Sequence, residues 1–268
     1  MRAHDRPIGV FDSGLGGLTV FKALSRRMPE ESLVYFGDTA HVPYGSKSKE
    51  AVTRYSTAIA RFLADLGVKA LVVACNTSSA LALPQIRKAV SVPVIGVIEP
   101  GVEAAAQVMR AGRVGIIGTE ATIASGAYEA ALKQRLPRLK IAAAACPLFV
   151  PLVEEGWWDH KVTREVARLY LKPLRRQRLE TLILGCTHYP VLRNTLHKVV
   201  VAKVRLIDSA EQTALETERR LSALGLRCCK GPAARRYFVS DAPQRFLRLA
   251  PRFLGAPVTR VALHAFDA

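Results

Sequence analysis

One pattern occurs twice in this chain and limits the folds that it can adopt. Residues 71–73 form an apolar run before Cys75, and residues 182–184 form a similar run before Cys186; a helical pattern follows each cysteine. Such a run is typical of a buried parallel strand. We therefore expect each cysteine at the carboxyl end of a strand, beside the next helix, which is where open α/β sheets bind their ligands.

The alternation of strand and helix patterns also occurs twice. It runs from residue 8 to residue 97 and begins again near residue 114, and the helix after Cys75 is expected to extend to about residue 89. Gly9 corresponds to Gly115, 106 residues later, and Cys75 corresponds to Cys186, 111 residues later. The sequence predicts an α/β protein with two similar parallel-sheet domains related by pseudo-two-fold symmetry, and an active site in the cleft between them.

A glycine-rich turn at residues 12–17 follows the first expected strand. Its spacing matches neither the dinucleotide-binding fingerprint nor a P-loop, which would end in Lys followed by Ser or Thr. Glycine lets the backbone approach a ligand closely. We interpret the segment as a turn that presents Asp12 and Ser13 at the edge of the sheet.

The composition excludes several classes of protein. The longest uncharged stretch, residues 141–153, contains two prolines and is too short to span a bilayer. The polar start lacks the pattern of a secretory signal, so we expect a soluble, cytoplasmic protein. The five cysteines lack zinc-site spacing and are expected to be reduced thiols, with adjacent Cys228 and Cys229 structural and no metal bound.

The formal net charge of +17 is the unusual bulk property. A field of this sign attracts small anions and supports nonspecific nucleic-acid binding. The arginines lie in clusters such as residues 175–178 and 235–236, which the pattern places on helix faces and loops. We favour the interpretation that they form a solvated surface, since no RNA-binding or zinc-finger motif accompanies them.

Seven motifs in order along nearly the whole chain resemble those of the cofactor-independent aspartate/glutamate racemase family. They lie at residues 11–17, 37–39, 43–45, 75–77, 146–154, 185–190 and 239–241. His41 is the one departure noted, because members often carry arginine there. The resemblance implies a first domain of residues 1–97 plus 209–268, which carries Cys75, and a second domain of residues 98–208, which carries Cys186.

The resemblance also implies an activity and its residues. It implies that L- and D-glutamate are interconverted without a cofactor, which supplies D-glutamate for peptidoglycan synthesis, and that the protein is a homodimer. The catalytic set that it implies is Cys75, Cys186, Asp12, His188 and Glu154. The substrate-binding set is Asp12, Ser13, Tyr44, Gly45, Asn76, Thr77, Thr187 and His188.

Physical chemistry gives this assignment a mechanism. Racemisation removes the Cα proton from one face and returns a proton to the other, so two opposed groups share the work. By resemblance, Cys75 acts on the D-isomer and Cys186 on the L-isomer. We expect the helix that follows each cysteine to lower the pKa of its thiol, and donors such as Asn76 and Thr77 to stabilise the carbanion.

Three alternatives remain open. The same motifs would suit an aspartate racemase or another amino-acid racemase of the family, because they do not measure the length of a side chain. Cys186 and His188 alone would suit a thiol hydrolase, although Cys75 would then be unexplained. The basic surface would suit binding to DNA or DNA gyrase, as a secondary role.

Overall fold

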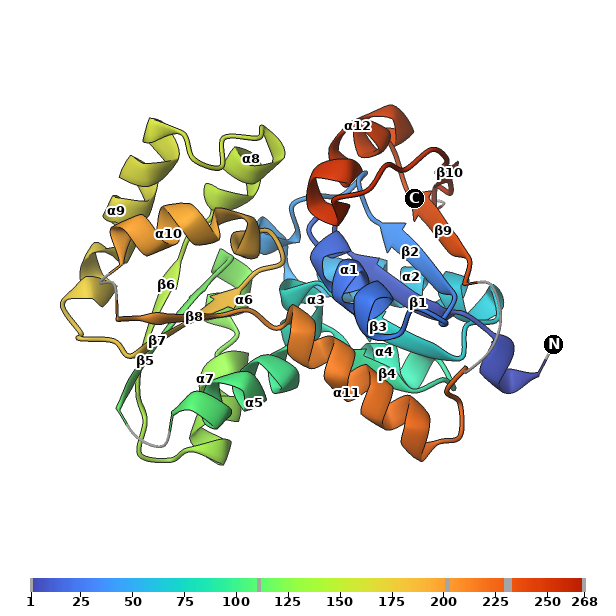
Figure 1. The fold of residues 1–268 in the computed structure, drawn as a ribbon, viewed down its shortest axis with the longest axis horizontal. Helices are drawn as coiled ribbons and strands as arrows, with labels where there is room; N and C mark the ends of the chain where they lie inside the picture. The colour runs from blue at the N-terminus through green and yellow to red at the C-terminus, as the bar shows by residue number, and fades with distance from the viewer. Residues whose placement is uncertain (1, 110–111, 201–202, 229–232, 267–268) are drawn as a thin grey trace.

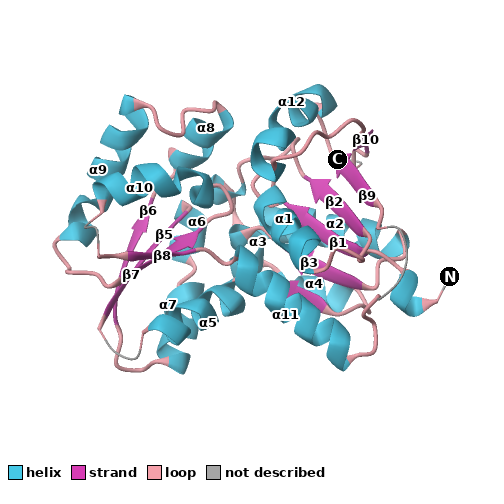
Figure 2. Cartoon of the chain, viewed as in Figure 1, coloured by secondary structure: helices cyan, strands magenta, loops and turns pink. Residues whose placement is uncertain are grey.

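The computed structural model describes residues 2–109, 112–200, 203–228 and 233–266, so Cys229 lies outside the described residues. Its strands form two separate parallel sheets, each covered by helices on both faces (Figures 1 and 2). The predicted α/β class with two parallel sheets is therefore confirmed.

The first sheet has six strands in the order β10-β9-β2-β1-β3-β4, and every neighbouring pair is parallel. Its central strands are apolar and buried on both faces, as parallel sheets require. The strands are β1 (Ile8–Asp12), β2 (Leu33–Gly37), β3 (Ala70–Val73), β4 (Val94–Gly96), β9 (Arg235–Val239) and β10 (Ala262–Leu263).

The second sheet has four parallel strands in the order β6-β5-β7-β8. This order repeats β2-β1-β3-β4 of the first sheet, which is what a duplicated unit predicts. Cys75 therefore follows β3 and Cys186 follows its counterpart β7. The strands are β5 (Arg113–Gly118), β6 (Lys140–Ala145), β7 (Thr181–Gly185) and β8 (Arg205–Ile207).

The helices connect the strands and cover the sheets (Figure 2). Those before β5 are α1 (Leu18–Arg27), α2 (Lys49–Asp65), α3 (Asn76–Leu81), α4 (Leu83–Ala89) and α5 (Ile98–Val108). Those that follow are α6 (Glu120–Ala124), α7 (Ala127–Arg135), α8 (Phe149–Glu154), α9 (Lys161–Arg175), α10 (Arg193–Val199), α11 (Ala210–Ala223) and α12 (Pro243–Leu254). Short 3-10 turns lie at Ala3–Asp5, Tyr44–Ser46 and Tyr189–Leu192.

The prediction of a single helix from Cys75 to about residue 89 is wrong in one respect. The segment divides at Ala82 into α3 and α4, and Pro84 lies in the first turn of α4. Proline has no backbone N–H and its ring clashes with the carbonyl four residues earlier, so a proline at this position breaks or kinks a longer helix. The result is a short α3 that begins immediately after Cys75.

The C-terminal segment returns to the first sheet. Strand β9 pairs with β2, with Tyr35 opposite Tyr237, and α11 packs against α1. Figure 1 shows both chain ends on the side of the first sheet. We propose from this the domain division of residues 1–97 plus 209–268 and residues 98–208. One buried apolar cluster crosses between the halves, with Leu18 and Phe21 on one side and Phe149 on the other.

Across the described ranges, no helix combines the length and the apolar character needed to cross a lipid bilayer.

Candidate active site

Two buried cysteines from corresponding strand ends line one cavity. Cys75 follows β3 and is the N-cap residue of α3, while Cys186 comes directly after β7. Both are almost fully buried, and neither forms a disulfide. Cys146 is also buried but does not line this cavity.

Nine of the eleven predicted site residues line the cavity: Ser13, Tyr44, Gly45, Cys75, Asn76, Thr77, Cys186, Thr187 and His188. The remaining two, Asp12 and Glu154, lie one layer behind the lining. Asp12 accepts a hydrogen bond from Thr187, and Glu154 pairs with His188. Sequence reasoning missed the lining residues Val42, Pro43, Thr119 and Val150.

Cys75 is surrounded by polar groups of its own half. Its sulfur lies 3.6 Å from Ser13 Oγ and accepts a hydrogen bond from the backbone N–H of Ser78 at 3.5 Å. Burial, and then the negative charge of Asp12, raise the pKa of the Cys75 thiol to about 11, although the Ser78 contact opposes this. The expected lowering of this pKa by the helix is therefore wrong, because desolvation of the thiolate outweighs one backbone donor.

Cys186, in contrast, lies beside a group that carries positive charge. His188 Nδ1 lies 3.9 Å from Cys186 Sγ, and His188 Nε2 lies 3.2 Å from Glu154 Oε1. Burial alone would lower the pKa of His188, but the contacts with Cys186 and Glu154 raise it to about 10. The imidazole is thus protonated at neutral pH, and its positive charge stabilises negative charge on the adjacent sulfur.

A third charged residue extends this chain of contacts to the surface. Arg245, from α12 in the C-terminal segment, donates a hydrogen bond to Glu154 Oε2 at 3.0 Å. Burial alone would raise the pKa of Glu154, but His188 and Arg245 hold it below its usual range. Glu154 therefore remains an anion between two cations, and Arg245 joins the C-terminal segment to the half that carries Cys186.

Asp12 connects the two halves beneath the cavity. The fully buried carboxylate accepts hydrogen bonds from the Gly14 backbone N–H at 3.0 Å and from Thr187 Oγ1 at 3.2 Å. Burial raises the pKa of Asp12, and the positive charge of His188 opposes that shift. The turn at residues 14–17 must approach closely for this contact, since a Cβ on Gly17 would lie 2.4 Å from Asp12 Cβ.

Uncharged polar side chains line the wall between the two sulfurs. Thr77 Oγ1 lies 3.0 Å from Thr119 Oγ1 and 3.1 Å from Thr122 Oγ1, so these hydroxyls connect the halves. Tyr128 donates a hydrogen bond to Asn76 Oδ1 at 2.7 Å. The Asn76 amide nitrogen is buried without a hydrogen-bond partner among the described residues, so it is a free donor at the cavity wall.

A buried carboxylate fixes the loop that carries Tyr44. Asp38 accepts hydrogen bonds from the Tyr44 hydroxyl and from Ser240 Oγ, the latter at 2.6 Å. His41, the one departure from the family motifs, lies 2.9 Å from the same carboxylate and stacks on Tyr55. Burial and the neighbouring Asp38 raise the pKa of Tyr44 well above its usual value, so its phenol stays neutral.

Comparison with known proteins decides the family. Residues 12–217 match the model of the Asp/Glu/hydantoin racemases. The chain belongs to that family. A glutamate racemase from Geobacter metallireducens is 51% identical over 264 residues, which cover 97% of this chain and 98% of that protein.

Solved structures agree with this assignment to the Asp/Glu/hydantoin racemase family. A glutamate racemase from Thermus thermophilus in complex with β-chloro-D-alanine is 49% identical, with a TM-score of 0.88 and 98% of each chain covered. A glutamate racemase from Francisella tularensis in complex with D-glutamate is 36% identical, with a TM-score of 0.91 and the same coverage.

The cavity of this racemase-family chain is small. Its volume of about 20 Å3 is room for roughly one water molecule. An amino acid is larger than this volume and does not fit the cavity with the side chains as they stand. In the part of the chain that the structure describes, no group of three or more His, Cys, Asp or Glu side chains is placed to hold a metal ion.

Proposed function

We propose that this chain racemises glutamate, with Cys75 and Cys186 as the two acid/base residues. One observation carries the proposal: two buried thiols, each at the end of the corresponding strand of a repeated unit, line the same cavity. Membership of the Asp/Glu/hydantoin racemase family and the glutamate racemases among its relatives support the same activity.

The proposed chemistry needs only the two sulfurs and their surroundings. A thiolate on one wall takes the Cα proton and becomes a thiol, and the electron pair remains on the substrate beside its carboxylate. A thiol on the other wall then donates its proton to the opposite face of Cα and becomes a thiolate. The free amide of Asn76 and the hydroxyl of Thr77, which line the cavity, are proposed to stabilise the charge that develops between these steps. No cofactor takes part in this scheme.

The charges on the two sides favour one starting arrangement. Cys75, whose pKa is raised to about 11, holds its proton, while the positive charge of His188 lies beside the sulfur of Cys186. This arrangement suits L-glutamate, with Cys186 as base and Cys75 as acid. For D-glutamate the proton first moves to the other side, so that Cys75 acts as the base. Asp12, Glu154 and His188 set these protonation states.

The other lining residues are proposed to hold the substrate. Ser13, Tyr44, Gly45 and Thr187 surround the sulfurs with hydroxyl and backbone groups, which suit an ammonium and two carboxylates.

The test is racemisation of L-glutamate by purified protein in EDTA without pyridoxal phosphate, followed by circular dichroism. In heavy water, the product should carry deuterium at Cα. Absence of both signals would refute the proposal.

L-Aspartate, assayed in parallel, tests the alternative of an aspartate racemase. If aspartate is turned over faster than glutamate, aspartate is the substrate. Release of ammonia, or a covalent acyl intermediate at Cys186, would instead indicate a thiol hydrolase.

The cellular setting is proposed with the activity. D-Glutamate made here would supply peptidoglycan synthesis, and the cytoplasm is the proposed location because both thiols must stay reduced. A homodimer is proposed, which light scattering after gel filtration would test.

Binding to DNA or DNA gyrase is proposed as a secondary role supported by the net charge of +17. Steep salt dependence of DNA affinity would support that role.

A further inference from the structure

A second and larger cavity lies at the amino ends of the strands of the second sheet, whereas Cys186 lies at their carboxyl ends. Its volume is about 510 Å3, and its wall includes Thr181 and Arg205, the first residues of β7 and β8. Strand β7 runs from Thr181 at this cavity to Gly185, immediately before Cys186. Five residues at ~3.3 Å each place the two cavities about 17 Å apart along the strand. This cavity is therefore separate from the proposed active site.

Most of the lining of this second cavity is apolar. Seven of its 13 lining residues are leucine or valine, contributed by the ends of α5 and α9, the start of β7 and the segment that leads into β8. They are Val108, Leu171, Leu174, Leu179, Leu182, Val200 and Val204. A cavity of this volume with such a lining is typical of a small-molecule site.

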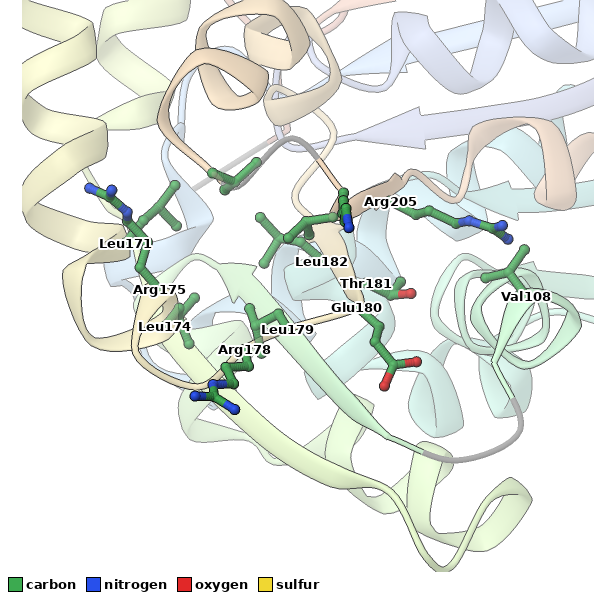
Figure 3. A pocket seen from close by; sticks show the side chains of 13 residues that line it. Val108, Leu171, Leu174, Arg175, Arg178, Leu179, Glu180, Thr181, Leu182 and Arg205 are labelled. Atoms are coloured by element: carbon green, nitrogen blue, oxygen red, sulfur yellow. The ribbon is translucent and has the colours of Figure 1, made fainter.

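Positive charge surrounds the apolar part of the lining. The lining includes four cationic side chains, Arg175, Arg178, Lys203 and Arg205, against one carboxylate, Glu180. In Figure 3 Leu179 and Leu182 lie centrally, while the charged ends of Arg175, Arg178 and Arg205 lie farther out. Within the described residues none of the four cations forms an ion pair, so their charge is available to a ligand.

One buried polar group of the wall lacks a partner. Thr181 is 1% exposed, and its hydroxyl has no hydrogen-bond partner among the described residues. A buried hydroxyl without a partner is costly and is uncommon in folded proteins. Thr181 lines the cavity, and rotation about its Cα–Cβ bond would turn the hydroxyl, which is shielded from solvent in this structure, toward a ligand seated there.

We propose that this cavity binds an amphipathic organic anion. Its apolar body packs on the leucines, its acidic group pairs with the surrounding arginines, and a polar atom meets the Thr181 hydroxyl. The apolar part of the lining does not suit a nucleic acid, which presents phosphates rather than apolar surface. A second copy of this chain is disfavoured as the occupant, because a symmetric contact at this face would bring its cations against the same cations of the partner. This site does not depend on the proposed racemase activity.

The test uses 8-anilinonaphthalene-1-sulfonate, an apolar anion whose fluorescence rises in apolar sites, titrated into the full-length protein. The double variant Arg175→Glu/Arg178→Glu should weaken binding by about tenfold or more, as the loss of charge-assisted contacts implies. Arg61→Glu/Arg87→Glu is the charge-matched control, since both arginines are exposed on α2 and α4 of the other sheet. It should leave binding within about twofold, because these positions are remote from the cavity. Equal loss in both double variants, or no binding by the unaltered protein, would overturn the proposal.

Two further arms locate the site and identify the ligand class. Val108→Trp, at a partly exposed position on the rim, should block binding of the dye while racemisation and the circular dichroism spectrum stay unchanged. Displacement by decanoate would indicate an acyl ligand, and displacement by 1-naphthoate an aromatic one. Either result supports the proposal. Equal displacement by uncharged decanol, or displacement by L-glutamate, would contradict it.

Discussion

Gly16 offers a sharp test of the proposed site, because it has no room for a side chain. A Cβ added there would lie 2.3 Å from Thr187 Oγ1 and 2.5 Å from His188 Nδ1, whereas ordinary contact begins at 3.4 Å. The Gly16→Ala variant must therefore displace these groups by about 1 Å. A shift of that size at a catalytic group costs roughly 100-fold in rate. His188 has little freedom to move, since it is buried and held by Glu154.

The assay is kcat/KM for both enantiomers of glutamate, followed by circular dichroism. Since the two enantiomers have equal free energy, kcat/KM must fall equally in both directions. We expect a loss of about 100-fold, together with a stability loss of about 1–3 kcal/mol from overpacking.

Gly115→Ala is the matched control for this test. Its Cβ would lie 2.5 Å from Leu179 Cδ1, a similar clash but with a flexible apolar side chain away from the site. This variant should also be destabilised and yet keep kcat/KM within about threefold. If Gly16→Ala retained activity at that level, or if Gly115→Ala lost as much, the role given to the contact with His188 would be refuted.

Three further predictions concern the charged groups. Cys75→Ala or Cys186→Ala should lower kcat/KM by at least the ~100- to 10,000-fold that a general acid or base contributes, with an unchanged far-ultraviolet spectrum; substantial activity in either would refute the assignment. Glu154→Gln should lower the pKa of His188 from about 10, so the alkaline limb of the pH–kcat/KM profile moves to lower pH, whereas an unmoved limb would exclude this coupling. Folding raises the pKa of His188, so the stabilisation that comes from protonating His188 is complete below the pKa of the unfolded state and disappears as the pH rises through about 10. The urea midpoint should therefore fall over that interval of pH, and it should fall less in Glu154→Gln.

Local patterns in the sequence predicted the elements that carry the site. Cys75 and Cys186 were placed correctly at strand ends because an apolar run that gives way to polar residues is a local signal. Thr119 also carries a local signal, because Gly118-Thr119 repeats the strand end at Asp12-Ser13, and this repeat places Thr119 at the cavity. Pro84 is a local signal for the break between α3 and α4, although the surrounding helical pattern continues across it.

Other features depend on contacts that no local pattern contains. Arg245 reaches Glu154 from 91 residues away in the chain, through α12. The raised pKa of Cys75 arises from complete burial and from the nearby Asp12, which together outweigh the single helix donor that the sequence suggested. The cavity volume likewise depends on how closely the two halves approach, which the repeated pattern leaves undetermined.

The repeated unit places two thiols equivalently, but their surroundings are unequal, and the proposed reaction permits this. Asp12 puts a negative charge near Cys75, while His188 puts a positive charge beside Cys186. A racemase needs equal kcat/KM for the two enantiomers, because their free energies are equal, but it does not need equal groups. With one proton shared between two sulfurs, a difference in charge selects which sulfur holds it when the site is empty. A symmetric site would leave that proton divided equally between the two walls, whereas the unequal charges prepare the empty site for L-glutamate and require a proton transfer before D-glutamate reacts.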